Sequence, residues 1–190
     1  MCIRDRLWSP DTPDLYEAEL RLYADGELRD TRSVPFGVRE LKIVPDRGMF
    51  LNGEPIKFRG VCLHHDLGPL GAAVNVSALR RQLSILKEMG ANAVRTAHNI
   101  PAPELVELCD RMGLMVMVET FDEWRTPKMK NGYHLYFDEW AERDLVNTVR
   151  RFRNHPSVVM WCIGNEVPDQ SSYEGAKIAR WLQDLSLIHI

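Results

Sequence analysis

The pattern of apolar and polar positions in this sequence changes near residue 38. Between residues 8 and 38 apolar side chains alternate with charged ones, as at Leu20, Arg21 and Leu22. A period of two is typical of a half-buried antiparallel strand. Asp25-Gly26 predicts a tight turn between two such strands. Since two or three strands do not form a stable sandwich, we expect this segment to be the end of a β domain whose beginning is absent.

From residue 39 onward, continuous apolar runs alternate with segments in which apolar residues recur at helical spacing. A second hairpin turn is predicted at Asn52-Gly53. Four buried strands are expected to begin near residues 56, 91, 114 and 157. The expected helices run from the cap Ser77 to Gly90, from Pro103 to Gly113, from the cap Asp138 to Phe152, and from Tyr173 to Leu185. This alternation predicts a parallel sheet with helical crossovers.

Polar residues follow each of the four predicted strands. They are His64 to Asp66, Arg95 to Asn99, Glu119 to Trp124, and Asn165 with Glu166. Such bias toward the carboxyl ends of the strands is typical of a (β/α)8 TIM barrel, whose substrates bind at that end. A doubly wound sheet is the alternative, but no glycine-rich phosphate loop follows the first strand. We therefore expect an α/β fold that contains the N-terminal half of a TIM barrel.

The last of these strands carries the strongest candidate for catalysis. A continuous apolar run from Pro156 stops at Gly164, and Asn165 and Glu166 follow at once. A carboxylate at this place is a candidate catalytic acid. The alternative for Glu166 is a loop glutamate that caps the next segment.

Composition excludes several classes of function. The chain has 24 Lys and Arg against 27 Asp and Glu, interspersed, so no nucleic-acid or membrane surface is indicated. No apolar run approaches the roughly 20 residues that a bilayer requires, and no signal-peptide core is evident. The compartment, periplasmic or cytoplasmic, therefore stays open. The four cysteines lack metal or redox spacing, and Cys62 and Cys162 are predicted to be buried thiols.

Eight motifs taken together resemble glycoside hydrolase family 2, the group of β-galactosidases, β-glucuronidases and β-mannosidases. In the order of the family they are Leu7-Trp8-Ser9-Pro10, Phe36-Gly37-Val38-Arg39, Leu51-Asn52-Gly53, Arg59-Gly60-Val61 with His64, Asn92 to Asn99, Leu108-Cys109-Asp110, Arg153 to Ser157, and Trp161 to Glu166. The stretches Phe121 to Trp124 and Tyr133 to Asp138 are most similar to the β-galactosidase branch.

The resemblance implies a division of the chain and a reaction. Residues 7–38 would be the last strands of an immunoglobulin-like β-sandwich, and residues 39–185 the first half of the catalytic barrel. Residues 1–6 and 186–190 match nothing in the family and are expected to be non-native flanks. The implied reaction is retaining hydrolysis of a β-linked carbohydrate, most similar to a β-galactoside. The oligomeric state stays open.

The resemblance also implies roles for individual residues. Glu166 matches the general acid/base, and Asn165 matches the amide that binds the sugar 2-hydroxyl. The other residues expected to bind substrate are His64, Arg95, His98, Asn99, Glu123 and Trp124. Asp122, Glu123 and Trp124 are expected to form a pocket wall, since aromatic faces suit sugar rings, and a surface loop is the alternative.

Two departures from the family pattern change the expectation. The nucleophile of the family is a second glutamate well downstream of the acid, and this chain ends before that position, so we expect a fragment that is inactive by itself. Some relatives bind Mg²⁺ through a glutamate and a histidine. Glu123 fits that glutamate, but Arg125 stands where the histidine would be, so no metal or other cofactor is expected.

Two other functions stay open beside the glycosidase. A metal-dependent hydrolase on the same barrel usually places His-x-His on the first strand, and the adjacent pair His64-His65 breaks that spacing. A non-catalytic or sugar-binding piece of a barrel is the other alternative, since half a barrel exposes strand edges and lacks one carboxylate.

Overall fold

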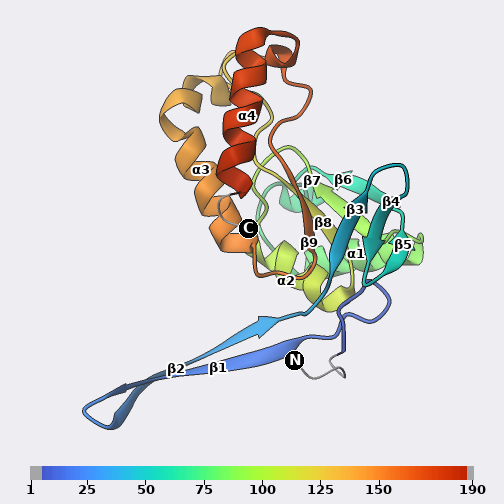
Figure 1. Ribbon diagram of the computed structural model, residues 1–190, viewed down its shortest axis with the longest axis vertical. Helices are drawn as coiled ribbons and strands as arrows, with labels where there is room; N and C mark the ends of the chain where they lie inside the picture. The colour runs from blue at the N-terminus through green and yellow to red at the C-terminus, as the bar shows by residue number, and fades with distance from the viewer. Residues whose placement is uncertain (1–5, 188–190) are drawn as a thin grey trace.

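The computed structural model describes residues 6–187, which form a two-stranded, a three-stranded and a four-stranded sheet together with four α-helices (Figure 1). The first sheet is an antiparallel ribbon of β1 (Tyr16–Ala24) and β2 (Glu27–Phe36) that projects away from the remaining elements. Its turn at Asp25-Gly26 has positive φ at both residues, as a tight hairpin turn requires. The predicted hairpin is therefore confirmed.

The second sheet lies across the amino-terminal end of the barrel strands. It consists of β3 (Leu41–Val44), β4 (Gly48–Leu51) and β5 (Glu54–Ile56), in that order. The turn predicted at Asn52-Gly53 joins β4 and β5. Leu51 and Ile56 pack with Ala93 and Met115 of the barrel strands and close that end of the parallel sheet.

The third sheet is parallel, as predicted, and its strands follow one another in chain order. They are β6 (Gly60–Leu63), β7 (Ala93–Thr96), β8 (Met115–Glu119) and β9 (Val158–Cys162). The first strand begins at Gly60 and not near residue 56, because Ile56 belongs to the hairpin sheet. A Cβ atom on Gly60 would overlap the carbonyl group of Ala93, so a glycine allows β6 and β7 to pair there.

The four helices of the described residues pack in two groups. Helices α1 (Val76–Glu88) and α2 (Pro103–Met112) share one apolar cluster with β7 and β8. Helices α3 (Phe137–Phe152) and α4 (Tyr173–Leu187) form a second cluster around Phe137. The short 3₁₀ segments are Gly68–Leu70, Tyr133–Leu135 and Pro168–Ser171. No helix within residues 6–187 is long and apolar enough to cross a membrane.

Two predicted helix caps are wrong. Helix α1 is capped by Asn75, whose Oδ1 atom accepts a hydrogen bond from the Ala78 backbone N–H at 3.0 Å, and Ser77 lies inside the helix. Asp138 lies in the first turn of α3, where it pairs with Arg125 at 2.6 Å. Both helices were predicted in the right place, since their apolar spacing is independent of the capping residue.

The two segments that flank the ribbon, one before β1 and one after β2, are tied to the barrel by hydrogen bonds. Trp8 is fully buried and its indole N–H donates to the carbonyl of Asp110 at 2.8 Å. Arg39 donates from Nε to the carbonyl of Pro156 at 2.6 Å, and from Nη2 to that of Val158. The contacts of Arg39 fix the start of β9, the strand that leads to Glu166.

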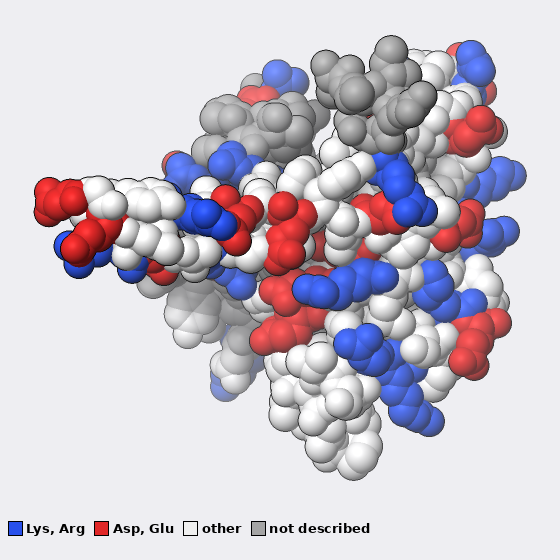
Figure 2. Space-filling model, turned by 90° about the horizontal axis from the view of Figure 1, so that it is seen from below, with Lys and Arg blue, Asp and Glu red and all other residues white. Residues whose placement is uncertain are grey.

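Charged side chains of both signs are mixed on the surface, and the described residues of the two predicted flanks contact the rest of the chain. Seen from below in Figure 2, acidic and basic side chains lie next to one another without a large area of one sign. Of the flanks predicted to be non-native, residues 1–5 and 188–190 lie outside the described residues. Arg6 forms an ion pair with Asp14 at 3.0 Å, and Ser186 is buried in the last turns of α4.

Candidate active site

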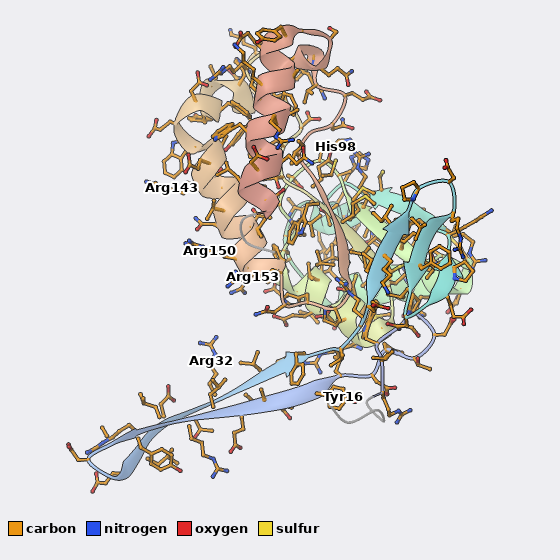
Figure 3. All side chains as sticks on the ribbon, in the orientation of Figure 1. Tyr16, Arg32, His98, Arg143, Arg150 and Arg153 are labelled. Atoms are coloured by element: carbon orange, nitrogen blue, oxygen red, sulfur yellow. The ribbon has the colours of Figure 1, made fainter. Side chains whose placement is uncertain are left out.

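The loops that follow β6, β7, β8 and β9 meet at the carboxyl end of the parallel sheet. Figure 3 shows His98 at this end, beside the segment that leaves β9 for α4. The strand register aligns Leu63, Thr96, Val118 and Trp161 across the sheet, so the residues just beyond them are brought to one level. The predicted site residues on these loops therefore come from four neighbouring strand ends.

Glu119, the last residue of β8, is the centre of the polar network at this end. Its side chain is fully buried. Arg95 donates from Nη2 to Oε1 at 2.7 Å, and Nδ1 of His98 lies 2.9 Å from Oε2. The backbone N–H of Glu119 donates to Thr96 Oγ1 at 3.1 Å. A buried carboxylate is stable only when it is paired and hydrogen-bonded, and Arg95 and His98 meet that requirement.

Arg95 connects this carboxylate to Asn165. The same Nη2 atom donates to Oδ1 of Asn165 at 3.0 Å. Burial by itself would lower the pKa of Arg95, but the hydrogen bond and charge of Glu119 outweigh it and raise the pKa. Arg95 is thus a permanent positive charge at the floor of the site. Its Nη1 atom faces Cys62 at 3.7 Å on the open side of the sheet.

Asn165 is also held from its other side. Its Nδ2 group donates to Oδ1 of Asp122 at 3.1 Å, and its carbonyl accepts a hydrogen bond from Nζ of Lys128. Burial would raise the pKa of Asp122, but hydrogen bonds from Lys128 and Asn165 outweigh it and hold the pKa below its usual value. Asp122 therefore stays a carboxylate that accepts from both neighbours.

Glu166 follows Asn165 directly and is exposed. Its backbone has φ of 44°, in the left-handed region that residues with a Cβ atom seldom adopt. Within residues 6–187 its carboxyl group forms no hydrogen bond with another side chain or backbone group. The carboxyl group is therefore open to solvent beside an amide whose orientation is fixed.

The two predicted histidines lie together. The rings of His64 and His98 meet edge to face, with centroids 4.9 Å apart. His65 has positive φ and lines a separate small apolar cavity together with Asn99. The structure thus brings His64 and His98 into the site but does not bring Asn99 into the polar network.

The predicted pocket wall differs from the structure. Glu123 is 2% exposed and Trp124 is 3% exposed, so neither offers a surface to a sugar. The Trp124 indole N–H donates to the carbonyl of Ile163 at 2.7 Å. Both residues are buried because the chain after β8 folds back over them, which the local sequence does not reveal.

Glu123 anchors that returning loop at two points. Its Oε1 atom accepts from the backbone N–H of His134 at 2.9 Å and lies 2.8 Å from the His134 ring, while Oε2 accepts from the Lys128 backbone N–H at 2.6 Å. Burial would raise the pKa of Glu123, but the two backbone hydrogen bonds and His134 lower it to about 2. The carboxylate is therefore charged at all ordinary pH values.

These contacts do not fit a magnesium site of the kind known in some family members. Glu123 is 2% exposed, and its two carboxylate oxygens accept the backbone N–H groups of His134 and Lys128, so the carboxylate is engaged inside the protein. Arg125 points away from the site and pairs with Asp138 at the surface. No three His, Cys, Asp or Glu side chains in the described part of the chain form a metal-binding group.

The role of Glu119 and the burial of Cys62 differ from what the sequence alone determined. Glu119 was not predicted to bind substrate: from the sequence, a carboxylate directly after an apolar strand is either one that supports the site or one that caps a helix. Cys62 was predicted to be buried but is exposed, because it lies on the open face of the sheet next to Arg95. Burial raises the pKa of the Cys162 thiol, which lies 3.5 Å from Glu119 Oε1.

Comparison with known proteins agrees with this architecture. The family model "Glycosyl hydrolases family 2, TIM barrel domain" matches residues 43–187, and "Glycosyl hydrolases family 2" matches residues 3–39. A solved structure of a glycosyl hydrolase family 2 member from Bacteroides cellulosilyticus superposes with a TM-score of 0.93 at 39% identity, covering 97% of this chain and 24% of that chain.

Two curated relatives show the same likeness in sequence. The beta-galactosidase BoGH2A of Bacteroides ovatus is 53% identical over 167 residues, which cover 88% of this chain and 20% of that protein. A putative beta-glucuronidase of Formosa agariphila is 40% identical over 161 residues, covering 85% of this chain and 16% of that protein. The chain thus spans about a fifth of the length of the curated relatives it matches.

Proposed function

Because the chain belongs to glycosyl hydrolases family 2, we propose that it is part of a retaining β-glycosidase and carries that enzyme's general acid/base, Glu166. Residues 7–38 would be the end of the β-sandwich and residues 39–185 the first half of the catalytic barrel. The proposed substrate is a β-galactoside, since the relative named beta-galactosidase is more similar to this chain than the relative named putative beta-glucuronidase.

One observation carries the proposal. Asn165, the neighbour of Glu166, is held through its amide by Arg95 and Asp122, which come from two other strand ends. A surface glutamate that merely capped a helix would not need such a neighbour. A catalytic acid does, because its position relative to the sugar must be fixed within a fraction of an ångström.

The proposed reaction has two steps. In the first, Glu166 donates its proton to the glycosidic oxygen while a second carboxylate attacks the anomeric carbon. In the second, Glu166 takes a proton from the water that releases the sugar. Retaining enzymes hold the two carboxyl groups about 5–5.5 Å apart. The second carboxylate would come from a part of the enzyme outside this chain.

The neighbours of Glu166 have matching roles in this proposal. Asn165 donates one of its two amide N–H groups to Asp122, so the other remains for the sugar 2-hydroxyl. A hydrogen bond to that hydroxyl strengthens in the transition state. Arg95 supplies a fixed positive charge that would keep the second carboxylate ionised. His64 and His98 would contact the sugar hydroxyls.

The experiment uses the complete enzyme that contains this chain. Glu166→Gln should lower kcat/KM by about 10² to 10⁴ for a β-galactoside whose aglycone needs a proton to leave. A dinitrophenyl β-galactoside, whose aglycone leaves without a proton, should lose far less. Glu142→Gln, on the exposed side of α3, is the matched control. Unchanged turnover of the first substrate by Glu166→Gln would contradict the proposal.

A further inference from the structure

Lys128 places its ammonium group among three oxygen atoms at the candidate active site. Nζ donates to the carbonyl oxygen of Asp122 at 2.8 Å, to Oδ1 of Asp122 at 3.0 Å, and to the carbonyl oxygen of Asn165. An ammonium group has three N–H donors and no acceptor, so all of its donors are used. Lys128 thus joins the loop after β8 to the loop after β9.

The carbonyl group of Asn165, which Lys128 contacts, restrains the backbone of Glu166. It belongs to the peptide unit that joins Asn165 to Glu166, so fixing its direction also fixes the backbone rotation at Glu166. Glu166 has φ of 44°, a conformation that is unfavourable for a residue with a Cβ atom. Strained backbone of this kind persists only where the surroundings determine it. The hydrogen bond from Lys128 acts directly on that peptide unit.

The loop that carries Lys128 is itself fixed. The buried carboxylate of Glu123 accepts the backbone N–H groups of Lys128 and of His134, and therefore holds both ends of the segment between them. Lys130 belongs to the same segment but its side chain is exposed and forms no hydrogen bond within the described residues. The two lysines are thus chemically alike and differ in their contact with Asn165.

We propose that Lys128 is a positioning residue for the general acid/base: it holds the Asn165–Glu166 peptide unit in the orientation that directs the Glu166 carboxyl group at the glycosidic oxygen. The inference rests on the proposed role of Glu166. Lys128 itself need not touch the sugar, since its three donors are already engaged.

The test compares two substrates of the same sugar in the complete enzyme, a methyl β-glycoside and a dinitrophenyl β-glycoside. The first needs the acid for departure of its aglycone, and the second does not. Lys128→Met should lower kcat/KM for the methyl glycoside about tenfold more than for the dinitrophenyl glycoside, about 1.4 kcal/mol of selective transition-state stabilisation. Lys130→Met is the matched control and should leave the ratio of the two values unchanged.

The ratio of the two kcat/KM values does not depend on the amount of folded enzyme, so partial unfolding of a variant cannot imitate the result. Equal loss on both substrates in Lys128→Met would overturn the inference. Glu166→Gln, measured on the same pair, separates the two proposals: if it shows no selective loss, the proposed function fails. If Lys128→Met gives no active enzyme, Lys128→Ala, which also removes the three N–H donors, is measured by the same criterion.

Discussion

Arg95 and Asn165, which are 70 positions apart in the chain, are joined by a hydrogen bond of 3.0 Å from Nη2 to Oδ1. Because a guanidinium group can only donate, this contact also fixes which end of the Asn165 amide faces the arginine. The N–H end must then point to the opposite side, where Asp122 accepts it. Arg95 therefore sets the orientation of the residue next to the proposed acid.

The first prediction concerns Arg95. Its loss leaves Glu119, which is fully buried, without its cationic partner. Breaking a buried pair by removing one partner costs about 3–5 kcal/mol, and since the Arg95 side chain is 27% exposed, we expect Arg95→Met to lower the free energy of unfolding by about 3 kcal/mol. Urea unfolding of the complete enzyme that contains this chain, followed by fluorescence, measures this loss.

Two further variants test the reason given for that loss. Glu119→Gln combined with Arg95→Met should recover part of the stability, because the buried charge is then removed as well. Arg125→Met breaks an ion pair in which both side chains are more than half exposed, and should cost less than about 1 kcal/mol. Equal losses in Arg95→Met and Arg125→Met would show that the burial of Glu119 is not the cause.

The second prediction concerns Trp124, which is buried and donates to the carbonyl of Ile163. Trp124→Phe removes this hydrogen bond and leaves a small cavity, so the unfolding free energy should fall by about 2–3 kcal/mol. The control is Trp140→Phe, at a partly exposed position on α3. It should lower the unfolding free energy by less than about 1 kcal/mol. A rise in KM of Trp124→Phe without a loss of stability would instead favour direct contact with the sugar.

Much of the fold could be predicted because its signals are local. The hairpins at Asp25-Gly26 and Asn52-Gly53, and the helix that begins at Pro103 and ends before Gly113, are each determined by a few adjacent residues. The parallel order of the four barrel strands follows from their alternation with helices. The convergence of Arg95 and Asn165 follows in turn from that order.

The errors at the site concern residues whose environment is set by distant parts of the chain, whereas those at the helix caps are local. Glu123 and Trp124 follow a strand end, as Asn165 does, but the loop through Lys128 and His134 returns and covers them. Sequence spacing gives no measure of such a return. Asn75 and Ser77 are both good helix caps, so only the path of the preceding loop decides between them.

The third prediction concerns the ribbon of β1 and β2, whose apolar side chains lie in solvent. Leu20 is 55% exposed, Leu22 is 62% exposed and Tyr23 is 56% exposed. Since an isolated two-stranded ribbon is marginally stable in water, we expect these 190 residues, expressed alone, to self-associate and to lack hydrolytic activity. Size-exclusion chromatography with light scattering would detect the association. Leu20→Thr with Leu22→Thr should reduce it, whereas a monodisperse monomer of the unmodified chain would contradict the expectation.

The fourth prediction is a pH dependence of stability that comes from Glu123. Its pKa in the folded protein is about 2, below the value near 4.3 of an unfolded glutamate. A carboxyl group with a lowered pKa stabilises the fold above its unfolded pKa, and this contribution is lost as the pH falls toward the folded value. The difference corresponds to about 3 kcal/mol, present at pH 5 and above and declining between about pH 4.5 and pH 2.

The variant Glu123→Gln tests this contribution. It should be less stable than the parent protein at neutral pH and should lose less unfolding free energy on acidification. Urea unfolding of the complete enzyme between pH 3 and pH 7 measures both effects. Glu142→Gln, at an exposed position of α3, is the control that keeps the acid slope of the parent protein. Parallel curves for the parent protein and Glu123→Gln would mean that the carboxylate does not hold the loop.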